Sequence, residues 1–200
     1  FKKYDFHNLY KELLNFCTVD LSAFYFDIRK DTLYCDPINS EKRKSCVTIL
    51  NILLKSLLRW FAPILSFTTE EIHQLISKNS KSIHLEKFLT FPEKFENEEL
   101  KERWSQLIKI RDICNISIEE KRASKEIGSS LEAELKIKLN EKYKDIITKI
   151  DLSELCIVSK TQINFDKGSD VLVETIKASG DKCPVCWKIS TEPCKRHGVK

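Results

Sequence analysis

One segment, residues 41–62, constrains the fold more than any other part of the sequence. Polar residues recur at Lys44, Thr48, Asn51, Lys55 and Arg59, at intervals of three or four, and nearly all residues between them are apolar. This is the period of an α-helix with one narrow polar stripe, so we expect a long helix that neighbouring segments enclose on most sides. Pro63 ends it, because the ring removes a backbone donor and disfavours helical geometry just before it.

A second, shorter helix should follow this proline. Thr68 or Thr69 offers a hydroxyl that can cap its amino end, and Glu70 and Glu71 then fall in its first turn, where negative charge suits the helix dipole. Acid–base chemistry is the alternative role for the two glutamates. We interpret them as structural, because they are adjacent and occupy positions that helix starts prefer.

Helical periodicity extends on both sides of this pair. Residues 4–28 place apolar side chains at helical intervals, with a disturbance near residues 18–20. Residues 78–95 are polar and contain proline, and should be irregular. A long helix should then run from about residue 97 to Gly128, a natural C-terminal cap. These segments predict a mainly α fold, an antiparallel helical bundle over residues 1–128.

After Gly128 the apolar period changes. Residues 131–139 alternate strictly between apolar and charged, which is typical of a half-buried strand. Further predicted features are a helix cap at Asn140, strands at 155–158 and 171–176, and a turn at 166–169. We therefore expect a small α/β unit over residues 129–178, followed by a separate segment, residues 179–200.

Composition limits the class of protein. A chain of 200 residues with 42% hydrophobic content can form one domain with a hydrophobic core and a second, smaller unit. No run of roughly 18 apolar residues is free of charged residues, so no membrane span is expected. The first residues of the chain lack the pattern of a signal peptide. The formal net charge of +4 does not by itself indicate a polyanionic partner. Because the chain starts at Phe1 and contains no Met, we expect a piece of a longer protein or a processed product.

The strongest chemical signal is Cys183-Pro-Val-Cys186-Trp187, followed by Cys194-Lys-Arg-His197. A C-x2-C turn lets two thiolates hold one ion, and the second pair completes a tetrahedron. Four protein ligands leave no position for water, so the predicted zinc ion is structural. A segment this short has no core of its own, so metal binding would supply its folding energy. The alternatives are reduced thiols on a disordered tail and a redox C-x2-C pair.

The other five of the eight cysteines are scattered singly through the sequence. They are Cys17, Cys35, Cys46, Cys114 and Cys156. We expect them to be core thiols, because unpaired cysteine behaves as a small hydrophobic residue. The whole pattern indicates a reducing compartment and one metal site.

Basic residues accompany the cysteine motif. Between residues 181 and 200 there are five Lys or Arg and two acids. Trp187 could stack on a nucleic-acid base, worth about 1–3 kcal/mol, or could serve as a hydrophobic prop for the zinc loop. Lys121, Arg122 and Lys125 could touch phosphates, although such a cluster is also typical of a solvated face that complements the helix dipole. The sequence contains no Gly-rich phosphate loop, nucleophile elbow or carboxylate–metal cluster, so we expect no catalytic residues.

Several stretches resemble one family, the bacterial-type isoleucyl-tRNA synthetases of class I. Residues 4–36, YDFHNLYKELLNFCTVDLSAFYFDIRKDTLYCD, resemble the opening helices of its anticodon-binding domain. Residues 57–75, LLRWFAPILSFTTEEIHQL, resemble its Ala-Pro-Ile-Leu-x-Phe-Thr-x-Glu-Glu-Ile segment. KEIGSSLEAEL (residues 125–135) and KCPVCWKIS (residues 182–190) resemble its small C-terminal domain and its zinc knuckle. The match covers essentially the whole chain in the same order, and the Cys-Pro-x-Cys-Trp ending favours the isoleucine enzymes over their valine and leucine relatives.

The sequence departs from this family in a few places. Ser66 stands where proline is usual and His73 where an aromatic residue is usual. The second ligand pair is Cys194 and His197 after a shortened loop, where the family normally has another C-x2-C. The His-x-Gly-His and Lys-Met-Ser-Lys-Ser signatures that bind ATP in the family are absent, and the editing domain is not represented.

The resemblance implies the C-terminal part of a cytoplasmic, monomeric enzyme of this family, with a zinc knuckle over residues 179–200. Outside this chain the parent enzyme would use ATP to charge tRNA(Ile) with isoleucine, and the chain would adjoin its catalytic domain and hold the anticodon stem-loop. Structural zinc would bind Cys183, Cys186, Cys194 and His197. The candidate tRNA-binding residues are Trp187, Lys188, Lys195, Arg196, Lys121, Arg122 and Lys125. A protein-binding zinc module and an architectural tail are the other functions that stay open.

Overall fold

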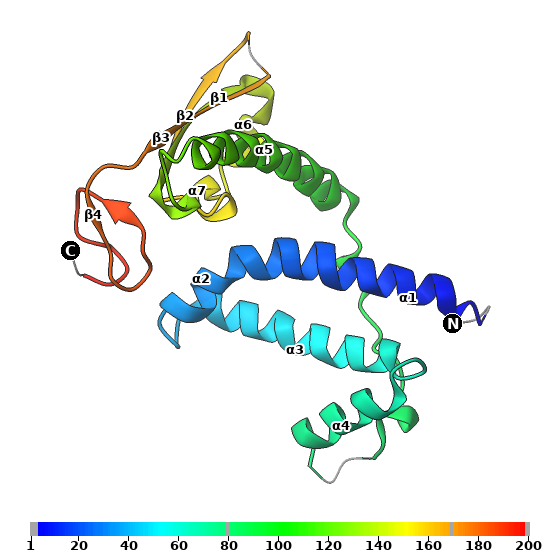
Figure 1. Cartoon of the computed structure of the whole chain (residues 1–200). Helices are drawn as coiled ribbons and strands as arrows, with labels where there is room; N and C mark the ends of the chain where they lie inside the picture. Colours follow the sequence, from blue (N-terminus) through cyan, green and yellow to red (C-terminus); the bar gives the residue numbers. More distant parts are fainter. Residues whose placement is uncertain (1–3, 79–80, 169, 199–200) are drawn as a thin grey trace. The chain divides into compact units, whose positions relative to one another are not determined.

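The computed structural model describes residues 4–78, 81–168 and 170–198. Their contacts divide the chain into two compact units, residues 1–95 and residues 96–200, which are described separately. Most of the chain is helical, and a small sheet lies in the second unit, as expected from the sequence (Figure 1). Among the described residues no helix has both the length and the apolar character needed to cross a membrane.

The first unit contains only helices and turns in its described part. Its elements are α1 (Phe6–Asn15), η1 (Phe16–Phe26), α2 (Asp27–Cys35), α3 (Glu41–Phe61), α4 (Ser66–Ile76), η2 (Ile83–Leu85) and η3 (Glu93–Phe95). The first three form one continuous helical rod, and α3 runs back along it (Figure 1). The short 3₁₀ turns η2 and η3 lie in the segment expected to be irregular, of which residues 79–80 fall outside the described part.

The disturbance expected near residues 18–20 is a change of helix type. Over η1 the backbone winds as a π-helix, whose i→i+5 bonds rotate the following side chains around the axis. Leu13, Leu21 and Ile28 are all buried along this rod. The altered winding therefore keeps one apolar stripe facing inward across a break in the α-helical period.

The central helix α3 forms where expected, but it is not enclosed on most sides. Ser40 caps it by accepting the Arg43 N–H at 3.1 Å, and the helix ends two residues before Pro63. Val47 and Ile49 remain 42% and 44% exposed. The expectation of enclosure is wrong for this chain, because α2, α4 and η2 contact α3 without covering these side chains.

The start of α4 also differs from the prediction. The helix begins at Ser66, so Thr69 lies inside its first turn, where the hydroxyl donates to the Leu65 carbonyl at 3.0 Å. Glu70 accepts the Ser82 hydroxyl and the Ile83 N–H, both at 2.8 Å. Hydrogen bonds from Gln74, and then from Ser82 and Ile83, lower the pKa of Glu70. The structural interpretation of Glu70 is thus supported. The threonine cap and the placement of Glu70 and Glu71 in the first turn are wrong, because the helix begins at Ser66.

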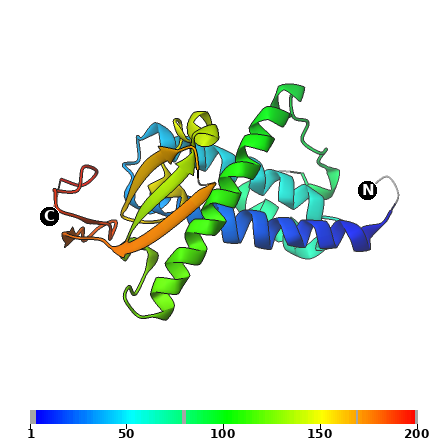
Figure 2. The same cartoon turned by 90° about the horizontal axis from the view of Figure 1, so that it is seen from above.

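The second unit combines one long helix with a three-stranded sheet of order β2-β1-β3. Its elements are α5 (Glu98–Ala123), η4 (Ser130–Glu132), β1 (Ala133–Asn140), η5 (Glu141–Tyr143), α6 (Lys144–Ile147), α7 (Leu152–Leu155), β2 (Lys160–Asp166), β3 (Val171–Lys177), β4 (Asp181–Lys182) and β5 (Ile189–Ser190). Helix α5 lies across one face of the sheet (Figure 2), and the Ser117 hydroxyl of α5 meets the Thr175 hydroxyl of β3 at 2.7 Å. The fully buried side chains at this contact are Leu107, Ile110, Cys114, Leu135, Ile137 and Leu139.

The contact units do not coincide with the expected domains. Because α5 packs on β3, contacts divide the chain after Phe95 and group α5 with the sheet. The boundaries at residues 128 and 178 stay a prediction.

The central strand β1 pairs in parallel with β2 and antiparallel with β3. A parallel pair needs a crossover connection, which η5, α6 and α7 provide. Asn140 caps η5 by accepting the Lys142 N–H at 3.1 Å, which confirms the predicted cap.

The strand expected at residues 155–158 is wrong. Leu155, Cys156 and Val158 are buried, but they belong to α7 and its exit. The strand follows at residues 160–166, where the burial pattern alternates between exposed and half-buried. At the edge of a sheet a strand can be largely polar, so apolar content was a poor guide to its position.

Helix α5 ends earlier than expected, and Gly128 does not cap it. The Lys125 N–H donates to Arg122 O at 3.0 Å, and the Glu126 N–H donates to Lys121 O at 3.1 Å. This is the Schellman arrangement, in which one residue takes the left-handed conformation that favours glycine. That residue is Lys125, with φ 60°. Gly128 instead donates its N–H to Glu132 Oε2 at 3.0 Å.

Lys125→Gly is therefore expected to stabilise the protein by about 0.5–1 kcal/mol, because it removes the strain of a side chain in the left-handed region. Urea unfolding monitored by circular dichroism measures this difference. Gly128→Ala is the matched control and should not destabilise, because its added Cβ meets Glu132 Oε1 at an ordinary 3.4 Å. A less stable Lys125→Gly variant would contradict this assignment of the helix end.

Candidate metal centre and RNA-binding residues

Residues 179–200, called the knuckle below, begin with a short hairpin in which β4 pairs with β5. The turn between them is closed by two backbone bonds, from Cys183 N–H to Lys188 O at 2.9 Å and from Trp187 N–H to Cys183 O at 3.0 Å. Gly180 precedes the hairpin with φ 118°, and a Cβ there would lie 2.2 Å from backbone atoms of Ser190. Only glycine permits this approach.

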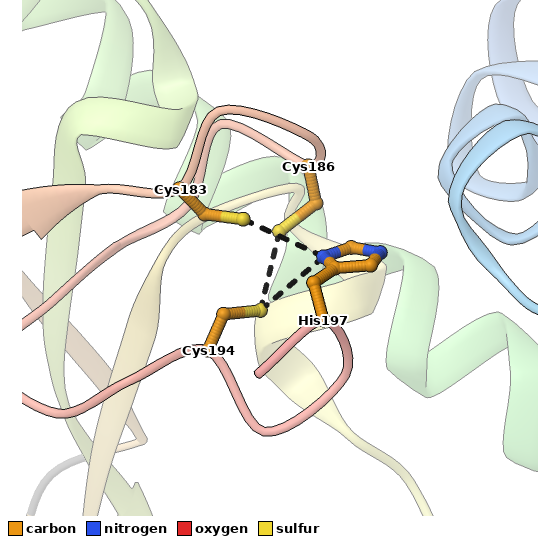
Figure 3. Close-up of side chains that lie close together, drawn as sticks. All are labelled: Cys183, Cys186, Cys194 and His197. Carbon is orange, nitrogen blue, oxygen red and sulfur yellow. Dashed lines mark hydrogen bonds between the residues drawn. The ribbon is translucent and has the colours of Figure 1, made fainter. Parts of the chain in front are cut away.

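The knuckle brings the four predicted ligands together (Figure 3). The ligand atoms of Cys183, Cys186, Cys194 and His197 all lie within 4.8 Å of one another. Cys186 Sγ lies 3.8 Å from Cys194 Sγ, and His197 Nδ1 lies 3.4 Å from the Sγ atoms of both Cys183 and Cys194.

These separations fit a tetrahedral metal site. Zinc bonds of about 2.3 Å to sulfur and about 2.0–2.1 Å to nitrogen require S···S edges of roughly 3.8 Å and S···N edges of roughly 3.6 Å. Cys183 and Cys186 are buried, and Cys194 and His197 are half-buried. The cluster can therefore hold one metal ion with four protein ligands.

The thiols differ in their ease of ionisation. Burial raises the pKa of Cys183, but hydrogen bonds from the N–H groups of Cys186 and Val185 and from His197 outweigh it and lower the pKa to about 6. Burial raises the pKa of Cys186 to about 12, where hydrogen bonds with Cys183 and Cys194 also favour the thiol. Because a metal ligand must be a thiolate, metal binding must release the proton of Cys186.

The remaining cysteines lie outside this cluster. None of the eight cysteines, all within the described residues, forms a disulfide, and Cys46, Cys114 and Cys156 are buried, as expected for core thiols. Cys17 and Cys35 are half-buried. The hydrogen bond between Cys156 and Cys114, and burial, raise the pKa of Cys156 well above its usual value.

The candidate RNA-binding residues of the knuckle surround its metal cluster. Trp187 is 59% exposed, and the Lys182 ammonium lies 5.1 Å from the centre of its ring. Its exposure leaves ring surface for stacking and does not fit a hydrophobic prop. Lys195 is exposed, whereas Lys188 and Arg196 are half-buried. Lys188, Lys195 and Arg196 line a pocket of about 340 Å³ beside the candidate metal ligands.

The helical candidates lie at the carboxyl end of α5, in a separate part of the second unit (Figures 1 and 2). Lys121 Nζ lies 2.8 Å from Glu126 Oε2, and Arg122 Nη1 lies 2.6 Å from Glu119 Oε1. Lys125 is exposed. These ion pairs fit the alternative of a solvated face and reduce the net positive charge available to RNA.

Sequence reasoning missed two residues beside the knuckle. The Ser159 hydroxyl donates to Leu131 O at 2.5 Å and accepts the Ile189 N–H at 2.6 Å. Asp151 lines the same pocket as Lys188. Burial opposes ionisation of Asp151, but hydrogen bonds from Ser153 and the nearby Lys188 charge lower its pKa. Asp151 caps α7 by accepting the Ser153 N–H at 2.8 Å, whereas no sequence pattern distinguishes Ser159.

Comparison with known proteins supports the resemblance seen in the sequence. The family described as "Anticodon-binding domain of tRNA ligase" matches residues 1–139. A curated isoleucine–tRNA ligase of Pelagibacter ubique is 64% identical over 98% of this chain and 22% of its own length. Those of Methylacidiphilum infernorum and Agrobacterium fabrum are 42% and 36% identical over 95% and 94% of this chain, and over 20% and 21% of their own lengths. The chain thus spans about a fifth of the length of these relatives.

Proposed function

Since the chain belongs to the family of tRNA-ligase anticodon-binding domains, we propose that it is the tRNA-binding part of an isoleucine–tRNA ligase. The observation that carries this proposal is the 64% identity to such an enzyme over 98% of the chain. The parent enzyme charges tRNA(Ile) with isoleucine, using ATP bound to residues outside this chain. The chain contributes no catalytic residue and holds the anticodon stem-loop.

We further propose three domains, a helical anticodon-binding bundle over residues 1–128, a small α/β domain over residues 129–178 and a zinc knuckle over residues 179–200. The family match supports the first boundary in part, because it continues through α5 to residue 139 and so joins this helix to those of the first unit.

The metal is proposed to be zinc, with a structural role. Three sulfur donors and one imidazole nitrogen are the donor set that zinc prefers, and their spacing suits a tetrahedron. Such an ion stabilises the fold of a short segment and leaves no coordination position for a substrate.

RNA recognition is assigned chiefly to Trp187, Lys195 and Arg196. RNA loops are bound through unstacked bases on aromatic rings and through phosphate contacts. An exposed indole and basic side chains beside one rigid metal cluster suit both kinds of contact. Lys188 is a secondary candidate because its charge faces Asp151. Lys121, Arg122 and Lys125 are secondary because they are distant along the chain from the knuckle, and the first two are paired with acids.

Contact with the rest of the parent enzyme has its own support. Phe67 and Leu75 of α4 are 93% and 73% exposed in this chain. Apolar side chains that contact another domain are exposed in this way when that domain is absent. We propose that this surface adjoins the catalytic domain of the same chain, in a monomeric enzyme. Eight cysteines without a disulfide suit the reducing cytoplasm in which we place the enzyme.

A salt titration of tRNA(Ile) binding tests the RNA assignment. Each phosphate contact contributes about 0.7 to the slope of log affinity against log salt for single-stranded RNA, so Lys195→Ala with Arg196→Ala should make the slope shallower by about 1.4. Lys109→Ala with Lys149→Ala is the matched control, since both lysines are exposed in the same unit. An unchanged slope in the Lys195/Arg196 variant would remove these residues from the interface, and the chain would then fit an architectural or protein-binding module.

A further inference from the structure

The side chain of Ser159 connects the zinc knuckle to the rest of the second unit. Its hydroxyl donates to the carbonyl of Leu131, just before β1, and accepts the N–H of Ile189, the first residue of β5. The backbone N–H of Ser159 also donates to Ala133 O at 3.1 Å, which fixes this residue at the start of β1. One half-buried hydroxyl thus bonds to the sheet side and to the knuckle at the same time.

Neither the metal ligands nor the chain entry sets the orientation of the knuckle, and the charge attraction between Asp151 and Lys188 acts across the same junction without a hydrogen bond between fixed backbone positions. The four ligands all belong to the knuckle, so a bound metal ties its loops to one another but not to the sheet. The chain enters the knuckle from β3 through residues 178–180, where the Ala178 N–H donates to Glu132 O at 2.8 Å. Rotation about the backbone dihedrals after Ala178 would turn the knuckle relative to the sheet. The bond from Ile189 to Ser159 opposes this rotation at a second, distant point of the hairpin.

We propose that Ser159 is a positioning residue for RNA binding, whose hydroxyl holds the knuckle in one orientation on the α/β domain. This inference rests on the proposed function of the knuckle. A fixed orientation presents Trp187, Lys195 and Arg196 to the RNA without an ordering cost at the moment of binding. Ser159 itself makes no RNA contact in this role.

The first test is amide hydrogen exchange in the zinc-loaded chain. In Ser159→Ala the Ile189 amide should exchange about 10-fold faster, because it loses its acceptor. The Cys183 amide, which bonds to Lys188 O inside the hairpin, should keep its protection, and zinc content should not change. Ser159→Thr keeps the hydroxyl and should restore protection. Ser179→Ala is the matched control, an exposed serine at the entrance to the knuckle.

The second test is the affinity of the same variants for tRNA(Ile). Ser159→Ala should bind about 10-fold more weakly with an unchanged salt slope, since no charged contact is removed, and Ser159→Thr should recover wild-type affinity. Unchanged exchange at Ile189 would overturn the bond between body and knuckle. Faster exchange with unchanged affinity would overturn the positioning role. If the wild-type chain does not bind tRNA(Ile), the proposed function is overturned. The hydrogen-exchange result does not depend on this outcome, so the two failures can be distinguished.

Discussion

Replacing Cys183 by serine is expected to remove the bound metal and, with it, most of the affinity for tRNA. Apart from its short hairpin, the knuckle has only the cluster of four candidate ligands to hold it, so under the zinc proposal its fold depends on an ion whose binding is worth about 10–16 kcal/mol in comparable zinc peptides. Serine cannot supply the thiolate that the tetrahedral site needs. We expect zinc content to fall from about one equivalent to near zero and tRNA(Ile) affinity to fall at least about 10-fold.

Metal analysis and a tRNA-binding titration on the same preparations measure both effects. Cys17→Ser is the matched control, because Cys17 is a half-buried thiol of the first unit, outside the cluster. Helix α5 and the sheet have their own buried core, so the far-ultraviolet circular dichroism of Cys183→Ser should stay close to wild type. A variant that keeps both its zinc and its affinity would show that Cys183 is not a ligand.

Gly180→Ala should be the most damaging substitution that leaves every ligand in place. At φ 118° an alanine is strained, and its Cβ would lie 2.2 Å from the backbone of Ser190, so the hairpin cannot close without moving main-chain atoms. Strain and overpacking together cost about 3 kcal/mol or more. If this cost falls on the metal-bound state, zinc affinity drops by roughly 100-fold.

A competition assay with a zinc chelator measures that affinity. Excess zinc should partly restore the Gly180→Ala knuckle, because its four ligands remain, and should not restore Cys183→Ser. Gly168→Ala is the control, since an added Cβ there meets nothing within 4 Å. Wild-type zinc affinity in Gly180→Ala would mean that the hairpin does not determine the geometry of the metal site.

Strong, local sequence signals predicted part of the fold correctly. The thin polar stripe of α3, the break at Pro63 and the strict alternation of β1 each require one kind of backbone over many residues. The clustering of the four candidate metal ligands could be predicted for a similar reason, since C-x2-C and C-x2-H spacings are chemical constraints that do not depend on distant contacts.

Features that depend on tertiary contacts could not be predicted in the same way. The cap of α4 was predicted at Thr68 or Thr69, but the helix already begins at Ser66, soon after Pro63. The cap of α5 was assigned to Gly128 on residue type alone, whereas the chain places Lys125 in the left-handed conformation. Strand β2 was missed because an edge strand needs few apolar residues, and Ser159 because its two partners are distant in sequence.

Titration of the zinc-loaded wild-type chain with tRNA(Ile) at increasing salt is the most direct measurement. The account predicts binding at low salt that weakens steadily as salt rises, and its loss when a chelator removes the metal. If the fully metallated chain shows no affinity for this tRNA even at low ionic strength, the assignment of the knuckle as an RNA-binding element is wrong.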